Sequence, residues 1–159
     1  MTLDDWVLAL HVLSAFALVA GIILFWVLIL AARRADTADE TLAFRTFSTI
    51  AQATVGIGML GTIGFGVWLA FSVGGYDIWD GWIVAAIVLW LIGGGLGGRA
   101  GRAFAPAVNR ALELKKAGQT GPDAELSALN RTTQGVVLQA ATSIVVLLLV
   151  IDMIWKPGA

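Results

Sequence analysis

Four long apolar runs constrain the fold of this chain more than any other feature. Each run approaches or exceeds the ~20 residues that a helix needs to cross ~30 Å of hydrocarbon. No segment alternates between apolar and polar residues with period two, as a membrane-spanning barrel requires. We therefore expect an all-α integral membrane four-helix bundle forming one domain over residues 1–159, with spans at about 6–31, 46–72, 82–98 and 134–155.

The composition agrees with a membrane protein and excludes several other classes. Only 13% of the residues are charged, whereas a soluble domain is about a quarter charged. The net charge of −1 gives no electrostatic reason to expect nucleic-acid binding. Because the chain has no cysteine and one histidine, His11, thiolate and multi-histidine metal sites within one chain are excluded. The leading residues MTLDDW are acidic, so the first run is not expected to be a signal peptide.

The basic residues are expected to lie almost entirely on one side of the membrane. Of the 10 lysines and arginines, all but Lys156 fall between spans one and two or between spans three and four. The positive-inside rule therefore places these two segments in the cytoplasm, and both termini outside the cytoplasm of a bacterial inner membrane. The loop 73–81 is then external, and an aromatic belt is expected at the outer interface, formed by Trp6, Trp79, Trp82 and Trp155.

Helical extensions are expected on the cytoplasmic side. Thr37 followed by Glu40 fits a capping box, which predicts a helix start before span two. The segment 99–131 is expected to extend spans three and four as two helices around a turn at AGQTGPDAE. In its first arm, an apolar residue recurs every fourth position at Phe104, Val108 and Leu112.

Small residues recur along spans two and three. The stretch GIGMLG at 56–61 matches G-x-G-x-x-G, but no strand precedes it, so we do not interpret it as a nucleotide site. Residues of this kind let helices approach closely. Close packing of spans two and three, or of one of them across a homo-oligomer interface, is therefore expected. The residues concerned are Thr54, Gly58, Thr62 and Gly66 in span two, and Gly93, Gly94, Gly97, Gly98 and Gly101 in span three.

Two ionisable residues lie inside the apolar runs, at similar depths. His11 lies ~7–8 Å inside the outer end of span one, and Asp152 lies ~3–5 Å inside the outer end of span four. Because such groups in a membrane usually face a partner or a cavity, we expect His11 and Asp152 to lie near each other. The pair can serve as a structural clasp or as a functional site. Gln52 and Gln139 both lie toward the cytoplasmic side and are expected to hydrogen-bond to each other.

The stretch LALHVLSAFALVAGIILFW, followed by Arg33 and Arg34 in a four-span chain, resembles an uncharacterised family of bacterial predicted integral membrane proteins. It is more distantly similar to HemJ-type protoporphyrinogen oxidases and copper-resistance D-type proteins. The resemblance to the HemJ type implies haem binding by a first-span histidine, which His11 matches. A second histidine near the end of that span and a lysine in a later span, both found in that family, have no counterpart here.

Two functions remain open on these residues. The first is a non-enzymatic membrane component, as a scaffold, assembly or small transport subunit, which the absence of a Ser-His-Asp spacing, carboxylate dyad or phosphate loop favours. The alternative is a haem- or porphyrin-binding redox protein. In that alternative, His11 pairs with Met153, or with the same histidine of a second copy, as axial ligands. The expected partners are the lipid bilayer and a homo-oligomer, and the sequence does not identify a ligand.

Overall fold

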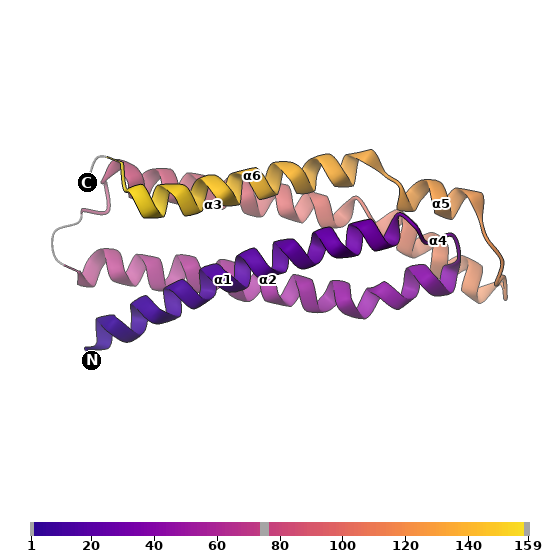
Figure 1. Cartoon of the computed structure of the whole chain (residues 1–159), viewed down its shortest axis with the longest axis horizontal. Coiled ribbons are helices and arrows are strands. Elements are labelled where there is room, and N and C mark those ends of the chain that lie inside the picture. Colours follow the sequence, from indigo (N-terminus) through magenta and orange to yellow (C-terminus); the bar gives the residue numbers. More distant parts are fainter. Residues whose placement is uncertain (1, 74–76, 158–159) are drawn as a thin grey trace.

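The computed structural model describes residues 2–73 and 77–157, and each regular element in these ranges is a helix (Figure 1). The expectation of an all-α fold is therefore confirmed for this part of the chain. Residues 74–76 of the expected outer loop lie outside the described residues. The helices are α1 (Leu3–Ala32), α2 (Ala38–Ser72), α3 (Gly81–Arg102), α4 (Ala105–Lys116), α5 (Ala124–Asn130) and α6 (Thr133–Trp155).

The long helices form two hairpins. α1 packs extensively against α2, and α3 packs extensively against α6, whereas contacts between the two pairs are few. The two chain ends and the α2–α3 connection lie at one end of the molecule, and α4 and α5 lie at the other (Figure 1). The described residues contain four helical segments that are long and apolar enough to cross a membrane. The prediction of four spans is confirmed in these terms.

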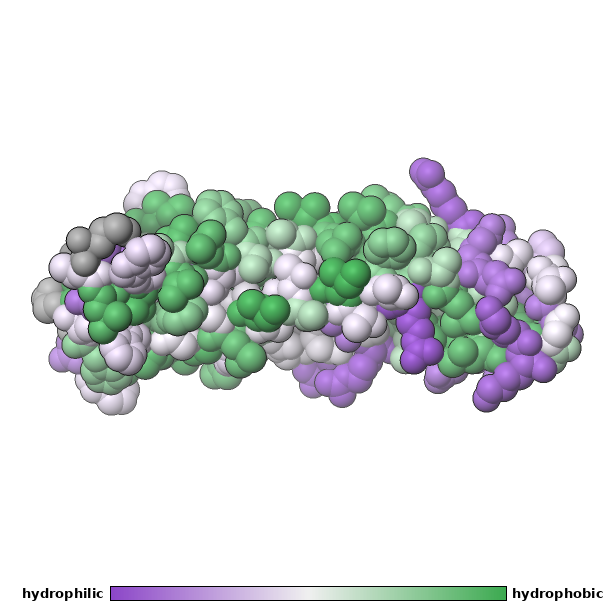
Figure 2. All heavy atoms as spheres, turned by 90° about the horizontal axis from the view of Figure 1, so that it is seen from below, coloured by the Kyte–Doolittle hydropathy of each residue, from purple (hydrophilic) through white to green (hydrophobic). Residues whose placement is uncertain are grey.

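The surface has the apolar character that a bilayer requires. On the face seen in Figure 2, apolar residues cover the body of the molecule, and hydrophilic residues gather at the end formed by α4 and α5. Large apolar side chains are exposed along the spans, for example Leu13 at 61% and Leu60 at 71%. This exposure suits contact with lipid or with the helices of other membrane proteins.

The starts of α1 and α2 share one local device. Thr37 accepts a hydrogen bond from the backbone of Glu40, and the Glu40 carboxylate accepts one from the Thr37 N–H. This is the capping box that the sequence predicts. Thr2 and Asp5 form the same arrangement at the start of α1. Both capping boxes supply acceptors for backbone N–H groups that have no partner inside the helix.

At the end of the molecule opposite the termini lie α4, α5 and the α1–α2 loop (residues 33–37). We call these three segments together the cap. α3 ends at Arg102 and α4 begins at Ala105, after two connecting residues, with Pro106 in its first turn. A proline suits this position because its missing N–H has no helical partner there. The expected cytoplasmic segment 99–131 thus forms the end of α3, then α4, a turn and α5.

The cap joins the two hairpins firmly. Its apolar core joins α2, α4 and α5 and contains Ala38, Ala107, Ala111, Leu114 and Leu126. Asn130 is 2% exposed and donates to the carbonyl of Ala35 and to the Thr41 hydroxyl. Arg131 forms an ion pair with Asp36 at 3.0 Å. The cap therefore fixes the two hairpins at one end, where α4 also packs against α2.

Candidate functional site

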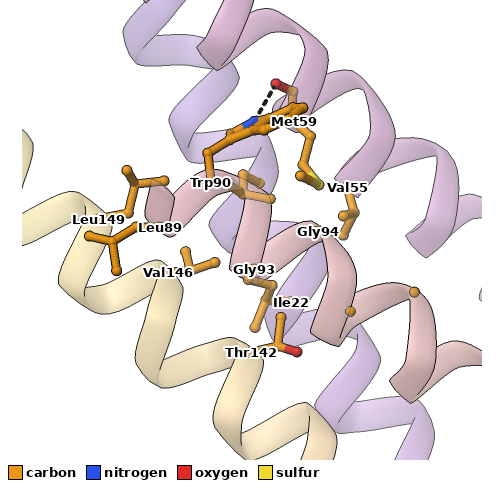
Figure 3. Close-up of a pocket in the computed structure, with 13 residues that line it drawn as sticks. Ile22, Val55, Met59, Leu89, Trp90, Gly93, Gly94, Thr142, Val146 and Leu149 are labelled. Carbon is orange, nitrogen blue, oxygen red and sulfur yellow. Dashed lines mark hydrogen bonds between the residues drawn. The ribbon is translucent and has the colours of Figure 1, made fainter. Parts of the chain in front are cut away.

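Two tryptophans form hydrogen bonds between the hairpins. Trp26 of α1 donates its indole N–H to Ser143 Oγ of α6 at 2.9 Å. Trp90 of α3 donates its indole N–H to the carbonyl of Met59 in α2 at 3.0 Å, as Figure 3 shows. A buried indole N–H without an acceptor is unfavourable. These hydrogen bonds therefore favour one relative orientation of the two hairpins, which make few other contacts with each other in this region.

A cavity of about 80 Å³ lies between the hairpins beside Trp90. Figure 3 shows Leu149 and Val146 of α6 on one side of it and Val55 and Met59 of α2 on another. Pockets that bind organic ligands usually measure roughly 300–1,000 Å³. The cavity is therefore much too small for a porphyrin, and its lining offers few polar groups to orient a ligand.

His11 lies against the neighbouring helix of its own hairpin. Its Cε1 lies 3.0 Å from the position that a Cβ on Gly66 of α2 would occupy. Nδ1 of the imidazole is buried and has no hydrogen-bond partner among the described residues. The imidazole is thus packed on a glycine of α2.

Asp152 lies in the last turn of α6, and Met153 follows it. Oδ2 of Asp152 is buried without a hydrogen-bond partner in the described ranges. α1 contacts α6 little, and Figure 1 shows the first turns of α1 apart from the last turns of α6. The structure therefore does not bring His11 together with either Asp152 or Met153, because each span packs mainly within its own hairpin.

The two glutamines expected to hydrogen-bond are also separate. Gln52 lies on an exposed position of α2 and donates to Ser48 Oγ of its own helix at 3.2 Å. Gln139 of α6 is 4% exposed, and its Nε2 has no partner within the described chain. Depth in the membrane was predictable for both residues, but the face of the helix on which each lies was not.

The small residues of α2 face α1 rather than α3. A Cβ at Gly58 would lie 2.5 Å from the backbone N of Leu18, and one at Gly61 would meet the side chain of Ser14. On α1, Gly21 lies equally close to Val55 of α2. The hydroxyls of Thr54 and Thr62 donate to carbonyls of their own helix. Close packing through small residues thus forms within the first hairpin.

The glycines of α3 face several neighbours. A Cβ at Gly93 or Gly97 would meet Val145 or Thr142 of α6 at 3.4–3.5 Å. One at Gly94 would lie 2.9 Å from Met59 Cε of α2, so this position does face span two as expected. Gly98 lies beneath the guanidinium group of Arg102 in its own helix, and Gly101 meets nothing within 4 Å. The contacts between α2 and α3 are few overall.

The expected aromatic belt is formed only in part. Trp6, Trp79 and Trp155 are 56–80% exposed at the end that carries the termini. Trp82 is 7% exposed, and Lys156 Nζ lies 5.2 Å from its ring centroid. Trp82 is therefore a packing residue with a cation on its ring, because it lies on the face of α3 that turns inward.

The sequence analysis did not predict the two indole N–H hydrogen bonds between the hairpins. It also did not predict the close contacts between α1 and α2 at Gly21 and Gly61. A tryptophan in the middle of an apolar run is a usable signal, because its N–H needs an acceptor on another helix. The described residues also offer no metal site. No group of three or more His, Cys, Asp or Glu side chains among them is placed to hold a metal ion.

A family model described as "Predicted integral membrane protein (DUF2269)" matches residues 5–157. The chain belongs to this family. The match covers all four spans and the cap, and it confirms the resemblance to uncharacterised predicted integral membrane proteins. It does not extend to the more distant similarity with HemJ-type or copper-resistance proteins. No curated protein and no solved structure matches the chain.

Proposed function

We propose that this member of the family is a non-enzymatic component of a bacterial cytoplasmic membrane, acting as a scaffold or assembly subunit. The observation that carries the proposal is the use of polar side chains in the spans. The hydroxyls of Ser14, Thr62 and Thr142 donate to carbonyls of their own helices. Trp26 and Trp90 form hydrogen bonds between hairpins. Trp90 and Thr142 line the small cavity beside Trp90, but the polar atoms of both are hydrogen-bonded to backbone carbonyls, so these groups support packing.

The exposed faces of the first hairpin are the surface for other membrane components. Leu13 and Phe16 of α1, and Ile57 and Leu60 of α2, are each more than half exposed. Apolar faces of this kind contact lipid or the spans of other proteins. The cap holds the two hairpins together at one end. This arrangement suits a structural role better than a function that requires the hairpins to move far apart.

Both termini are proposed to lie outside the cytoplasm, with the cap inside. The support is the basic segments around the cap, together with the termini lying at the opposite end (Figure 1). Because the chain has no cysteine, single-cysteine variants report accessibility without background. Thr2→Cys and Asp77→Cys should be labelled by a membrane-impermeant thiol reagent in intact cells, and Gln119→Cys should not. Labelling of Gln119→Cys from outside overturns this orientation.

The alternative function is a haem- or porphyrin-binding redox protein that uses His11. The observation in its favour is the buried Nδ1 of His11, which has no partner among the described residues. A His11–Met153 ligand pair within one chain does not fit, since the two residues lie on different hairpins and apart. Ligation by the histidines of two copies is the form of the alternative that the geometry leaves open.

One purification separates the two functions. The protein extracted in mild detergent from its own membrane is examined by absorption spectroscopy and by native mass measurement. A scaffold should show no Soret band, and it should occur in an assembly heavier than the 16.7 kDa chain. That assembly should persist in His11→Ala. A Soret band in the parent protein that His11→Ala removes and Ser14→Ala retains contradicts the scaffold and establishes the alternative.

A further inference from the structure

A second cavity, of about 310 Å³, lies where the first hairpin meets the cap. We call it the basal cavity. Its apolar wall includes Phe25 and Leu28 of α1 and Phe104 at the α3–α4 junction, and its polar edge includes Arg45, Ser48 and Gln52 of α2. This volume is within the range of small-molecule sites. Unlike the cavity beside Trp90, the basal cavity combines apolar walls with a charged group.

The wall at Phe104 is held in place by its neighbours. The ring lies directly over Gly135 at the start of α6, where a Cβ would overlap it. On the floor of the cavity, Asn130 is buried and hydrogen-bonded to Thr41 at 2.9 Å. The cavity is thus built from fixed parts of both hairpins and the cap.

The charge at the basal cavity is uncompensated. None of the described residues that line it is an aspartate or glutamate, and Arg45 is the only lysine or arginine among them. Three basic residues at this end have carboxylate partners, namely Arg110 with Asp123, Lys115 with Asp39 and Arg131 with Asp36, whereas Arg33, Arg34 and Lys116 form no ion pair among the described residues and do not line the cavity. Among the described residues, Arg45 has no ion pair. Beside it, Ser48 accepts from Gln52 at 3.2 Å, and its own hydroxyl proton is not used within the described chain. These groups favour an anion.

The depth of the cavity matches the headgroup layer. α2 runs from Ala38 to Ser72, and Ser72 lies at the opposite end of the span. At 1.5 Å rise per residue, Gln52 lies about 30 Å and Arg45 about 40 Å along the helix from Ser72. The hydrocarbon core is about 30 Å thick, and the bilayer with headgroups about 40–45 Å. With Ser72 at the far hydrocarbon boundary, the polar edge of the cavity runs from the near boundary at Gln52 to the outer side of the headgroups at Arg45, and Phe25 and Leu28 of the neighbouring helix line the apolar side.

We propose that the basal cavity binds one anionic phospholipid from the leaflet at the cap end. Its phosphate lies at Arg45, with the hydroxyl of Ser48 within reach, and its acyl chains follow Phe25, Leu28 and Phe104. This assignment rests on the membrane fold and not on the scaffold proposal. A soluble phosphate compound offers the same anion but has no acyl chains to cover the apolar wall.

Native mass spectrometry of the detergent-purified full chain tests the site. The protein is titrated with phosphatidylglycerol and, separately, with phosphatidylcholine of the same acyl chains. Phosphatidylglycerol should bind more tightly, and Arg45→Gln should weaken its binding about fivefold, as expected for one arginine near a lipid phosphate. Arg45→Lys should retain most of the affinity. The matched control is Arg34→Gln, which removes an exposed charge at the same end outside the cavity.

A second variant tests the apolar part of the site. Gly101 lines the basal cavity, and a Cβ there meets nothing within 4 Å. Gly101→Leu should therefore fill part of the cavity without a clash and weaken phosphatidylglycerol binding, while Gly56→Leu on an open face of α2 should not.

Three results overturn the proposal. The first is equal affinity for the two lipids. The second is an equal loss in Arg45→Gln and Arg34→Gln, which indicates general surface attraction. The third is displacement of the lipid by millimolar glycerol 3-phosphate together with unchanged binding in Gly101→Leu, which assigns the site to a free phosphate compound.

Discussion

Gly58 of α2 packs directly on the backbone of α1, and its replacement by alanine tests whether this contact holds the first hairpin together. The added Cβ would lie 2.5 Å from the backbone N of Leu18 and 2.7 Å from its Cα. A flexible side chain can turn away from such a clash, but a helix backbone cannot. The two helices must therefore move apart locally, and neighbouring contacts along the hairpin are lost.

The size of the effect follows from a matched control. Forcing an extra group into a well-packed contact costs roughly 1–3 kcal/mol. Alanine also favours the helix over glycine by about 1 kcal/mol. Gly56→Ala, two residues away, has the same gain in helix propensity, but its Cβ would meet nothing within 4 Å. The difference between the two variants isolates the steric cost. We expect Gly58→Ala to be less stable than Gly56→Ala by about 1–3 kcal/mol.

The assay is equilibrium unfolding in mixed detergent micelles, followed by circular dichroism and by tryptophan fluorescence. Gly94→Ala adds a second comparison, because its Cβ would meet the Met59 side chain, with Cε, the mobile end of that side chain, at 2.9 Å. It should cost less than Gly58→Ala. If Gly58→Ala and Gly56→Ala are equally stable, the close approach of α1 and α2 at Leu18 is refuted.

Three further predictions concern hydrogen bonds and charges. Trp90→Phe removes the indole donor to the Met59 carbonyl and should lower the free energy of unfolding by about 1 kcal/mol in the same assay. A hydrogen bond from Arg110 lowers the pKa of the Asp123 carboxyl below its usual value. The stability that this bond contributes is present above pH ~4 and lost as the pH falls through the lowered pKa, so unfolding of Asp123→Asn should depend less on pH there. His11→Ala and Asp152→Asn should give additive stability losses in the double variant, and a clear coupling energy would place the two side chains in contact.

The spans were predictable because one property decides them. Apolar runs of about 20 residues are long enough to cross a bilayer, whatever their neighbours. The capping box at Thr37 was equally predictable, since it depends on residues three positions apart. The length of an apolar run and a motif of neighbouring residues can both be read directly from the sequence, so the features that depend on them are predictable.

The packed face of α4 was harder to predict. The large residues Phe104, Val108 and Leu112 recur every fourth position, yet the buried face of α4 consists of Ala107, Ala111 and Leu114. Small side chains allow α4 to approach α2 closely, and a search for large apolar residues overlooks them. The basal cavity was missed for a related reason: its lining comes from five different helices and a junction, which no single periodicity reveals.

The neighbour of His11 can be understood from spacing along α1. His11, Ser14, Leu18 and Gly21 follow one another at intervals of three, four and three residues, which places them on one face of a helix. These residues meet Gly66, Gly61, Gly58 and Val55 of α2 in that order, as antiparallel packing requires. Two consecutive helices joined by a short loop usually pack together. His11 therefore lies in the seam of the first hairpin, and His11→Ala disturbs packing whether or not the imidazole binds a ligand. Loss of a bound group in His11→Ala supports ligation only if Ser14→Ala, three residues along the same seam, retains that group.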